Sequence, residues 1–222
     1  AGRLMASIAH EINNPLQAVQ NCIHLAHRSD LPLQSRQDYL QLAQSELERL
    51  TKTVQHMLDF YRPASIDRQA TNINQALTRV IHLMSQKLEE NRVEVSILFD
   101  PDLPSVYTVT DQIQQVFLNL ILNAIEAMPG GGKLEVSTLA LPKKWIEINF
   151  QDNGTGVNPK IRKRIFDPFT SARAGGIGLG LSISYGIISA HGGSLELVED
   201  DPKNKSGASS AGAHFRVRLP VE

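Results

Sequence analysis

Ser7-Ile8-Ala9-His10-Glu11-Ile12-Asn13-Asn14-Pro15-Leu16, close to the start of the chain, places one histidine within an amphipathic helical pattern. Apolar residues recur here at steps of three and four, the spacing of one helix face: Ile8, Ile12, Leu16, Val19, Ile23 and Ala26. His10 is two positions from Ile8 and from Ile12, about 200° around the helix axis from each. We therefore expect the apolar stripe to be buried and the His10 imidazole to point away from it.

The neighbours of His10 suit a nucleophilic imidazole. A histidine with an ordinary pKa near ~6.5 is mostly neutral at pH 7 and keeps one ring nitrogen unprotonated. Glu11 can hold the proton of the other nitrogen, and Asn14 lies one turn further on nearly the same face. Pro15 is expected to bend the helix. A solvated histidine without a chemical role would give the same local pattern, so this stretch alone does not decide the function.

A second helix is predicted after a turn at residues 28–32, which contain Ser, Asp and Pro. Its apolar residues alternate steps of three and four, as in a supercoiled seam: Leu40, Ala43, Leu47, Leu50, Val54, Met57 and Tyr61. Two helices cannot bury two such stripes by themselves. We therefore expect residues 1–62 to form an antiparallel hairpin that pairs with a second copy, giving a homodimeric four-helix bundle.

Composition narrows the class of protein. The chain has 222 residues, with 22 basic and 23 acidic side chains and a formal net charge of -1, so no nucleic-acid or anionic membrane partner is expected. No apolar run is long enough to span a bilayer. The single cysteine, Cys22, is expected in the core and fits a reducing, cytoplasmic location. Because the helical pattern is already present at residue 1, we expect a fragment of a longer protein, which could carry a membrane anchor and has its sensor region elsewhere.

The pattern changes after a predicted linker at residues 63–70, and residues 71–222 are expected to form a layered α+β domain. Helices are predicted at 72–90, 111–128 and 178–190, and strands at 93–99, 133–139, 145–151, 194–198 and 213–219.

Three stretches of this domain have residues suited to a nucleotide. Asn119 and Asn123, one helical turn apart, can direct two amides to one ligand or one hydrated Mg²⁺, although a solvated helix face explains them equally well. Asp152-Asn153-Gly154-Thr155-Gly156 follows a strand, where a carboxylate could accept from an adenine amine, but a plain turn has the same residues. Glycines at 175, 176, 178 and 180 open a helix N-terminus, which favours phosphate, and Arg173 could neutralise a terminal phosphate.

Taken together, the motifs resemble the ordered set of two-component sensor histidine kinases. The residues that carry the resemblance are His10 to Leu16, Asn119 with Asn123, Asp152-x-Gly154-x-Gly156, Ile165-Phe166-Asp167-Pro168-Phe169 and Gly176-x-Gly178-x-Gly180. The resemblance implies a dimeric phosphoacceptor hairpin followed by a Bergerat-type α/β sandwich, the ATP-binding domain shared with DNA gyrase B subunits and heat-shock chaperone ATPases.

The resemblance also implies roles for particular residues. His10 would be phosphorylated, Glu11 would orient it, and Asn14 would position water for dephosphorylation of a partner. Asn119 and Asn123 would meet Mg²⁺ and the phosphates, and Asp152 would bind the adenine amino group. The implied nucleotide site also includes Gly154, Gly156, Phe166, Arg173, Gly176, Gly178, Gly180 and Leu181. Phe166 and Phe169 would anchor a lid at 170–176, which is short, and Ile177 replaces the usual threonine.

The function implied is an ATP-dependent autokinase that phosphorylates His10 and passes the phosphoryl group to an aspartate of a response regulator. Two other functions stay open at this point. A degenerate dimeric scaffold would bind a receiver without kinase activity, and Ile177 with the short lid favours it. An ATPase clamp would need a glutamate where Asn119 stands, because an amide cannot act as a general base.

Overall fold

A computed structural model describes the backbone of residues 2–61, 67–170, 178–198 and 212–221. Side chains are described in the same ranges except at residues 2–13, 49 and 52–61. The chain divides into two compact units, Ala1–Arg62 and Pro63–Glu222. In the described ranges, none of the helices combines the length and the apolar character needed to cross a bilayer.

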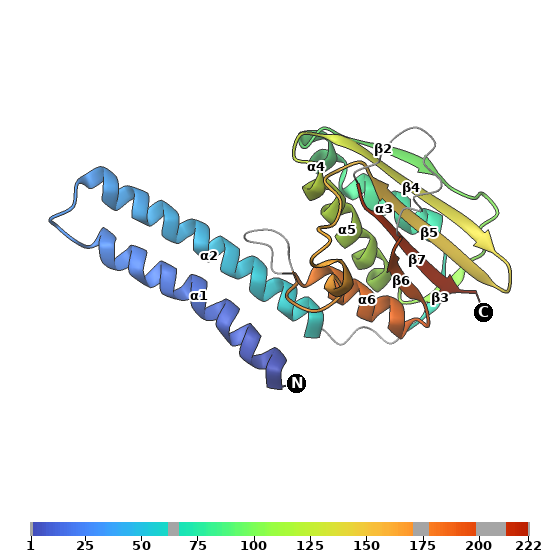
Figure 1. Ribbon diagram of the computed structural model, residues 1–222, viewed down its shortest axis with the longest axis horizontal. Helices are drawn as coiled ribbons and strands as arrows, with labels where there is room; N and C mark the ends of the chain where they lie inside the picture. Colours follow the sequence, from blue (N-terminus) through green and yellow to red (C-terminus); the bar gives the residue numbers. More distant parts are fainter. Residues whose placement is uncertain (1, 62–66, 171–177, 199–211, 222) are drawn as a thin grey trace. The chain divides into compact units, whose positions relative to one another are not determined.

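The first unit is a pair of antiparallel helices, α1 (Gly2–Ala26) and α2 (Leu33–Tyr61), with His10 in α1 (Figure 1). Pro15 lies within α1 and does not end it. The turn between the helices has its own polar contacts. Arg28 forms an exposed ion pair with Asp30, and Arg36 Nε donates to the carbonyl of Ala26 at 2.7 Å, which satisfies one terminal acceptor of α1. The predicted reversal is therefore confirmed.

Only part of each apolar stripe is buried within the hairpin. Val19, Cys22 and Ala43 form a small core, against which Tyr39 packs. Cys22 is thus a core residue, as predicted. Among the described side chains of the two stripes, four large ones stay exposed by 40–54% of their surface: Leu16, Ile23, Leu40 and Leu47. A single hairpin therefore leaves Leu40 and Leu47 of its predicted seam in contact with solvent.

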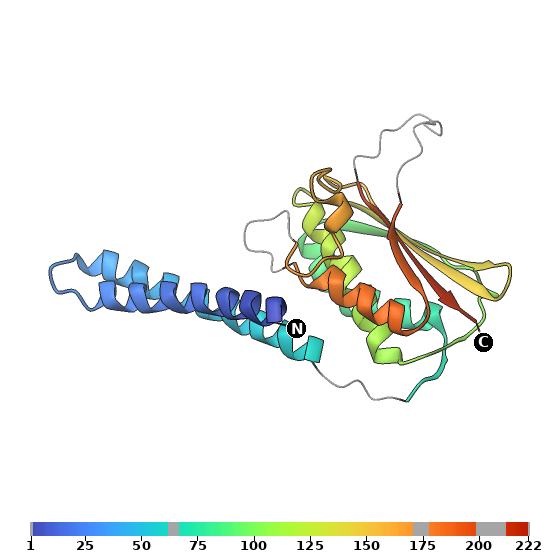
Figure 2. The ribbon, with the colours of Figure 1, turned by 60° about the horizontal axis from the view of Figure 1, so that its bottom comes forward.

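The second unit is a five-stranded mixed sheet with helices on one face (Figures 1 and 2). The strand order is β2-β4-β5-β7-β6, in which β2 and β4 are parallel and the other pairs are antiparallel. The strands are β2 (Val93–Leu98), β4 (Gly132–Leu141), β5 (Trp145–Asp152), β6 (Ser194–Leu197) and β7 (His214–Pro220). The helices are α3 (Ile73–Leu83), α4 (Ser85–Glu90), α5 (Thr110–Ala127) and α6 (Gly180–Ala190).

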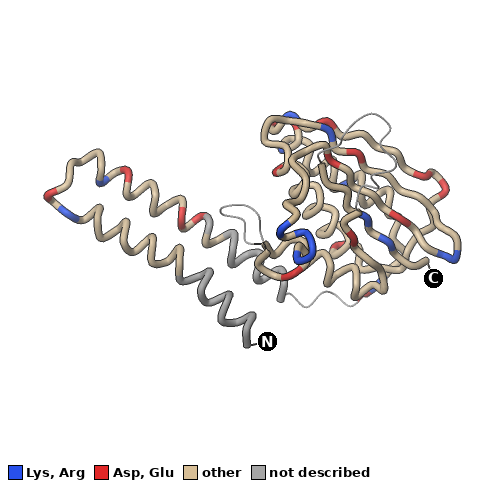
Figure 3. Tube along the Cα trace, viewed as in Figure 1, with Lys and Arg blue, Asp and Glu red and all other residues tan. Residues whose placement is uncertain are grey.

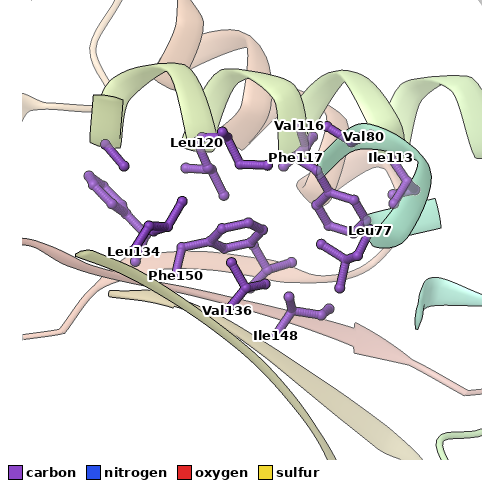
Figure 4. Packing of buried hydrophobic residues seen from close by; sticks show 14 of the residues in the cluster. Leu77, Val80, Ile113, Val116, Phe117, Leu120, Leu134, Val136, Ile148 and Phe150 are labelled. Carbon is purple, nitrogen blue, oxygen red and sulfur yellow. The ribbon is translucent and has the colours of Figure 1, made fainter. Parts of the chain in front are cut away.

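The core of this unit lies between α5 and the sheet (Figure 4). One side of α5 is apolar, and its Phe117 ring lies 5.8 Å from the ring of Phe150 on β5. Alternate residues of β5, Ile146 and Ile148 among them, are fully buried on the same face. This packing holds α5 rigidly against the sheet, so that polar residues on its other side have defined positions.

The structure differs from the sequence prediction in three places. The predicted helix 72–90 is two helices, because α3 ends at Leu83 and α4 begins at Ser85, with Met84 as the cap residue between them. A two-stranded antiparallel sheet, β1 (Gln69–Thr71) with β3 (Val106–Thr108), was not predicted, and β1 overlaps the predicted linker. A single 3-10 turn, η1 (Arg162–Arg164), was also missed. The strands β1 and β3, the turn η1 and the one-residue break between α3 and α4 are all too short for hydrophobic periodicity to detect.

A buried histidine makes the stability of this unit sensitive to acid. The His191 ring, at the end of α6, is 5% exposed; its Nε2 accepts from the backbone N–H of Val109 at 3.1 Å, and its Nδ1 lies 2.8 Å from the carbonyl of Ile187. Burial lowers the pKa of His191 below its ordinary 6.5, and nearby Arg68 lowers it further. The neutral ring is thus the form that the fold favours.

We expect the free energy of unfolding to fall as the pH drops below about 6.5. The pKa of His191 is lower in the folded than in the unfolded chain, so protons bind the unfolded chain more readily. The stabilisation is therefore complete above the pKa of the unfolded state and is lost as the pH falls toward that of the folded state. Urea unfolding at about pH 7.5 and about pH 5.5 measures this loss. His191→Gln keeps a donor and an acceptor without titrating, so its loss over the same interval should be smaller. Equal losses in both proteins would show that His191 does not contribute.

Candidate nucleotide site

The two asparagines of α5 have different surroundings. Asn119 Nδ2 lies 3.3 Å from the carbonyl of Gly180 and 3.3 Å from the hydroxyl of Ser184, so it joins α5 to the first turn of α6. Asn123, one turn later, has a buried Nδ2 that finds no hydrogen-bond partner among the residues that the structure describes. An unpartnered buried amide is costly, and it is expected where a ligand supplies the missing acceptor. Of the two asparagines, Asn123 is therefore the one whose buried amide nitrogen lacks an acceptor within the described part of the chain.

Asp152 ends β5 and is 5% exposed. Its Oδ1 accepts from the backbone N–H of Gly154 at 2.8 Å and from that of Ala213 at 3.2 Å. The first contact closes a tight turn, and the second comes from the residue just before β7. The carboxylate is therefore held in one place by two segments that are far apart in sequence, as a recognition group must be.

Two of the predicted glycines are required by close backbone approach. A Cβ at Gly154 would lie 2.5 Å from the carbonyl oxygen of Ala127, which instead accepts from the N–H of Thr155 at 3.1 Å. Gly178 has φ +70° and backs onto Thr170, whose backbone nitrogen would lie 2.7 Å from a Cβ. Gly156, with φ 68°, adopts the same left-handed conformation. These contacts bring the Asp152 loop against the end of α5 and bring residue 178 against the segment before it.

The segment between these glycines, residues 157–170, is anchored by apolar side chains. Ile165 is 3% exposed and belongs to the core of the second unit, and Ile161 packs against that core. The Phe166 ring lies 5.4 Å from the ring of Tyr185 on α6, with the two rings tilted by 31°. Phe169 adopts φ 62°, a strained value for a bulky residue. The predicted aromatic anchor thus contacts α6 directly through Phe166.

Besides α5 and the Asp152 loop, the start of α6 also borders the candidate site. The helix begins at Gly180, two residues later than predicted, and Leu181 packs against the core. Backbone N–H groups in the first turn of a helix lack helical partners and attract anions. Gly180 lies beside Asn119, since a Cβ built on it would be 3.7 Å from the amide carbon. The asparagine, aspartate and glycine motifs therefore meet around α5.

Some predicted site residues fall outside this description. Arg173, Gly176 and Ile177 lie outside the described residues, as does the predicted lid apart from Thr170. The side chains of His10 and Glu11 are likewise not described, so the outward direction of His10 stays a prediction. Asn14 is exposed on α1. The contacts of Ser184, Ala213 and Tyr185 were not predicted from the sequence. Of these, Ser184 alone had a sequence signal, its position one turn after Gly180.

The fold and site define an ATPase-type α/β sandwich that follows a helical hairpin. The histidine kinase-, DNA gyrase B- and HSP90-like ATPase family matches residues 108–222, and the His Kinase A (phospho-acceptor) domain matches residues 1–66. The chain therefore belongs to the histidine kinase-, DNA gyrase B- and HSP90-like ATPases. With the phospho-acceptor domain in front, it is the catalytic core of a two-component sensor histidine kinase, which confirms the resemblance.

Individual relatives cover the whole chain. The signal transduction histidine-protein kinase AtoS of Escherichia coli (strain K12) is 31% identical over 221 residues, 99% of this chain but 35% of AtoS. Histidine kinase ThkA in complex with response regulator protein TrrA matches with a TM-score of 0.77 at 23% identity, over 100% of this chain and 62% of that one. Full-length ShkA in complex with AMPPNP matches with a TM-score of 0.65 at 25% identity, over 98% of this chain and 45% of that one.

Proposed function

We propose that this chain is an ATP-dependent protein-histidine kinase that phosphorylates its own His10. The observation that carries the proposal is the buried Nδ2 of Asn123, which has no acceptor in the described ranges and lies beside a glycine-bordered site. The first 66 residues of the same chain match a phospho-acceptor domain. The AMPPNP bound to ShkA, an analogue of ATP, supports the same ligand class for this chain.

Asp152 accepts a hydrogen bond from the exocyclic amine of adenine, and the fixed position of its carboxylate suits that task. The backbone N–H groups at the start of α6 bind phosphate oxygens. The amide of Asn123 gains the partner that it lacks. These residues fit a nucleoside triphosphate because each offers the kind of polar group that its part of the ligand requires.

Mg²⁺ prefers oxygen ligands and keeps much of its hydration shell, and amide oxygens are suitable for it. Asn119 and Asn123 would hold this ion, which neutralises phosphate charge when bound. The amide oxygens of these two residues would face the ion, while the buried Nδ2 of Asn123, which finds no acceptor among the described residues, would donate to a phosphate oxygen.

The reaction forms a P–N bond between the γ-phosphorus and a ring nitrogen of His10 and breaks the bond between that phosphorus and the bridging oxygen, leaving ADP. Glu11 holds the proton on the other ring nitrogen, so that the attacking nitrogen keeps its lone pair. Positioning dominates, since phosphoryl transfer leaves little covalent work for the protein.

The receiving partner is an aspartate of a response regulator, whose carboxylate takes the phosphoryl group as the P–N bond breaks. The complex of ThkA with TrrA supports this class of partner. Asn14, exposed on α1, would position water for the reverse task of dephosphorylating that regulator. The chain spans 35% of the length of AtoS. We therefore propose that the whole protein also has a sensing region.

Incubation with γ-labelled ATP and Mg²⁺ tests the proposed kinase. A phosphohistidine is labile in acid and stable in alkali, so the label on the protein should be lost only in acid. A scaffold without kinase activity would bind a receiver and take up no label. An ATPase clamp would release labelled phosphate without labelling the protein, and the amide at Asn119 argues against it because it cannot activate water as a base.

We propose in addition that the hairpin pairs with a second copy. Leu40 and Leu47 of the predicted seam are 54% and 46% exposed, whereas Ala43 between them is buried against α1. The exposed residues therefore form a stripe that one hairpin does not cover. Burial of one leucine contributes about 1.5–3 kcal/mol, and twofold symmetry would bury each twice.

The double substitution Leu40→Gln, Leu47→Gln should convert the dimer to monomer, or weaken it by at least about tenfold, one step of ~1.4 kcal/mol. Sedimentation equilibrium of the full chain over a range of concentrations measures this. Leu42→Gln is the matched control, because Leu42 is 49% exposed but lies off the seam. A wild-type chain that stays monomeric at every concentration would refute the dimer.

A further inference from the structure

A cluster of basic side chains lies at η1, beside the candidate nucleotide site. It consists of Lys160, Arg162, Lys163 and Arg164, and all four residues are exposed. We call it the basic rim. Lys and Arg gather visibly at this position in Figure 3. Because the whole chain has a formal net charge of -1, this concentration of positive charge is local and is not a property of the protein as a whole.

The basic rim is carried by a rigid support. Backbone N–H groups of Ile161, Arg164 and Asp167 donate to carbonyls three residues earlier, at 3.1, 2.8 and 2.9 Å. Lys160 N donates to the Asn158 side chain at 3.0 Å. Since Ile165 of the same turns is buried in the core, the charged side chains are held on the outer side.

Both ends of this segment are close to the proposed nucleotide site. On one side, Gly156 of the Asp152 loop precedes Lys160 by only four residues. On the other side, the backbone of Phe169 and Thr170 would lie 2.7 Å from a Cβ at Gly178. The basic rim therefore stands between the proposed adenine loop and the glycines that precede α6.

Three of the four cations have no counter-ion among the described residues. Arg164 Nε pairs with Asp167 at 3.0 Å on the surface. The side chains of Lys160, Arg162 and Lys163 make neither a hydrogen bond nor an ion pair in the part of the chain that the structure describes. Exposed cations without a partner contribute little to folding, but their field extends over about a Debye length, ~8 Å in physiological salt.

We infer that the basic rim attracts the triphosphate of the nucleotide and raises its rate of association. The inference rests on the proposed nucleotide site. It assigns to these residues the long-range attraction of the nucleotide, whereas the site itself holds the bound nucleotide. The ligand class is a polyanionic nucleotide, which such a field steers toward the site. Long-range attraction acts on the association rate and leaves the dissociation rate almost unchanged, because these side chains need not touch the bound ligand.

The test replaces an adjacent pair, Arg162→Gln with Lys163→Gln, in the full chain. Stopped-flow binding of a fluorescent N-methylanthraniloyl ATP should then show an association rate lower by roughly three- to tenfold at low salt, within the range expected for steering. The difference should disappear at high salt, near ~0.5 M, where the Debye length falls to a few ångströms. The corresponding fluorescent adenosine, which has no phosphate, should bind both proteins at the same rate.

Lys143→Asn with Lys144→Asn is the charge-matched control. These two adjacent lysines are exposed in the β4–β5 turn, at the end of β5 remote from Asp152. They adopt φ 64° and 61°, values that asparagine tolerates. This variant has the same net charge as the first, so its association rate should match that of the wild type if position matters.

An unchanged association rate at low salt would overturn the inference, and so would an equal decrease in both variants. A normal nucleotide rate combined with slower phosphotransfer to a receiver would also overturn it and would assign the basic rim to a protein partner. If the wild-type protein bound no nucleotide, the proposed function would fail first, and the inference would fail with it.

Discussion

Replacing His10 by glutamine should abolish acid-labile phosphorylation of the chain while leaving nucleotide affinity unchanged. Glutamine has no basic ring nitrogen, so no P–N bond can form at residue 10. The proposed nucleotide site lies in the second unit, Pro63–Glu222, where the asparagine, aspartate and glycine motifs meet around α5. Radiolabel from γ-labelled ATP measures the first quantity, and titration calorimetry measures the second.

His24→Gln is the matched control for this variant. His24 is on the same helix and is exposed, but it lies outside the predicted phosphoacceptor motif. It should take up label like the wild type. Label that survives in the His10 variant with the same acid lability would assign the phosphoacceptor to another histidine. Loss of nucleotide affinity together with label would instead indicate damage to the fold.

The long helices were predictable because their periodicity extends over several turns. The apolar face of α5 and the reversal between α1 and α2 both follow from local sequence. The β1–β3 pair did not follow, since its register joins Gln69 to Thr108 across almost forty residues of chain. Strands of three residues have no alternation long enough to recognise, and their pairing depends on the rest of the fold.

The residues of the candidate site could be proposed from sequence, whereas their contacts could not. Asn119 and Asn123 appeared equivalent in sequence because they share one face of a helix. The structure separates them, since Asn119 reaches Gly180 and Ser184 and Asn123 does not. That difference depends on where α6 packs against α5. The late start of α6 has a local cause, because Gly178 at φ +70° cannot belong to a right-handed helix.

Asn123→Ala should weaken binding of Mg-ATP at least about tenfold, which corresponds to ~1.4 kcal/mol. The substitution removes an amide that would meet the phosphates and the ion, so autophosphorylation should fall with affinity. Titration calorimetry with Mg-ATP measures the affinity, and label uptake measures the activity. Gln115→Ala, two turns earlier on α5, is the control and should change neither quantity.

The effect of Asn123→Ala on the stability of the unliganded protein distinguishes a ligand-binding role of Asn123 from a structural role. The buried Nδ2 of Asn123 costs free energy in the unliganded protein because it has no partner, about 1–3 kcal/mol for such a group. Its removal should therefore leave the urea midpoint of the unliganded protein unchanged or higher. Asn119→Ala should lower that midpoint, since it breaks the contacts with α6. If Asn123→Ala destabilised the unliganded chain while Mg-ATP affinity stayed the same, Asn123 would be a structural residue and the nucleotide site would lose its main support.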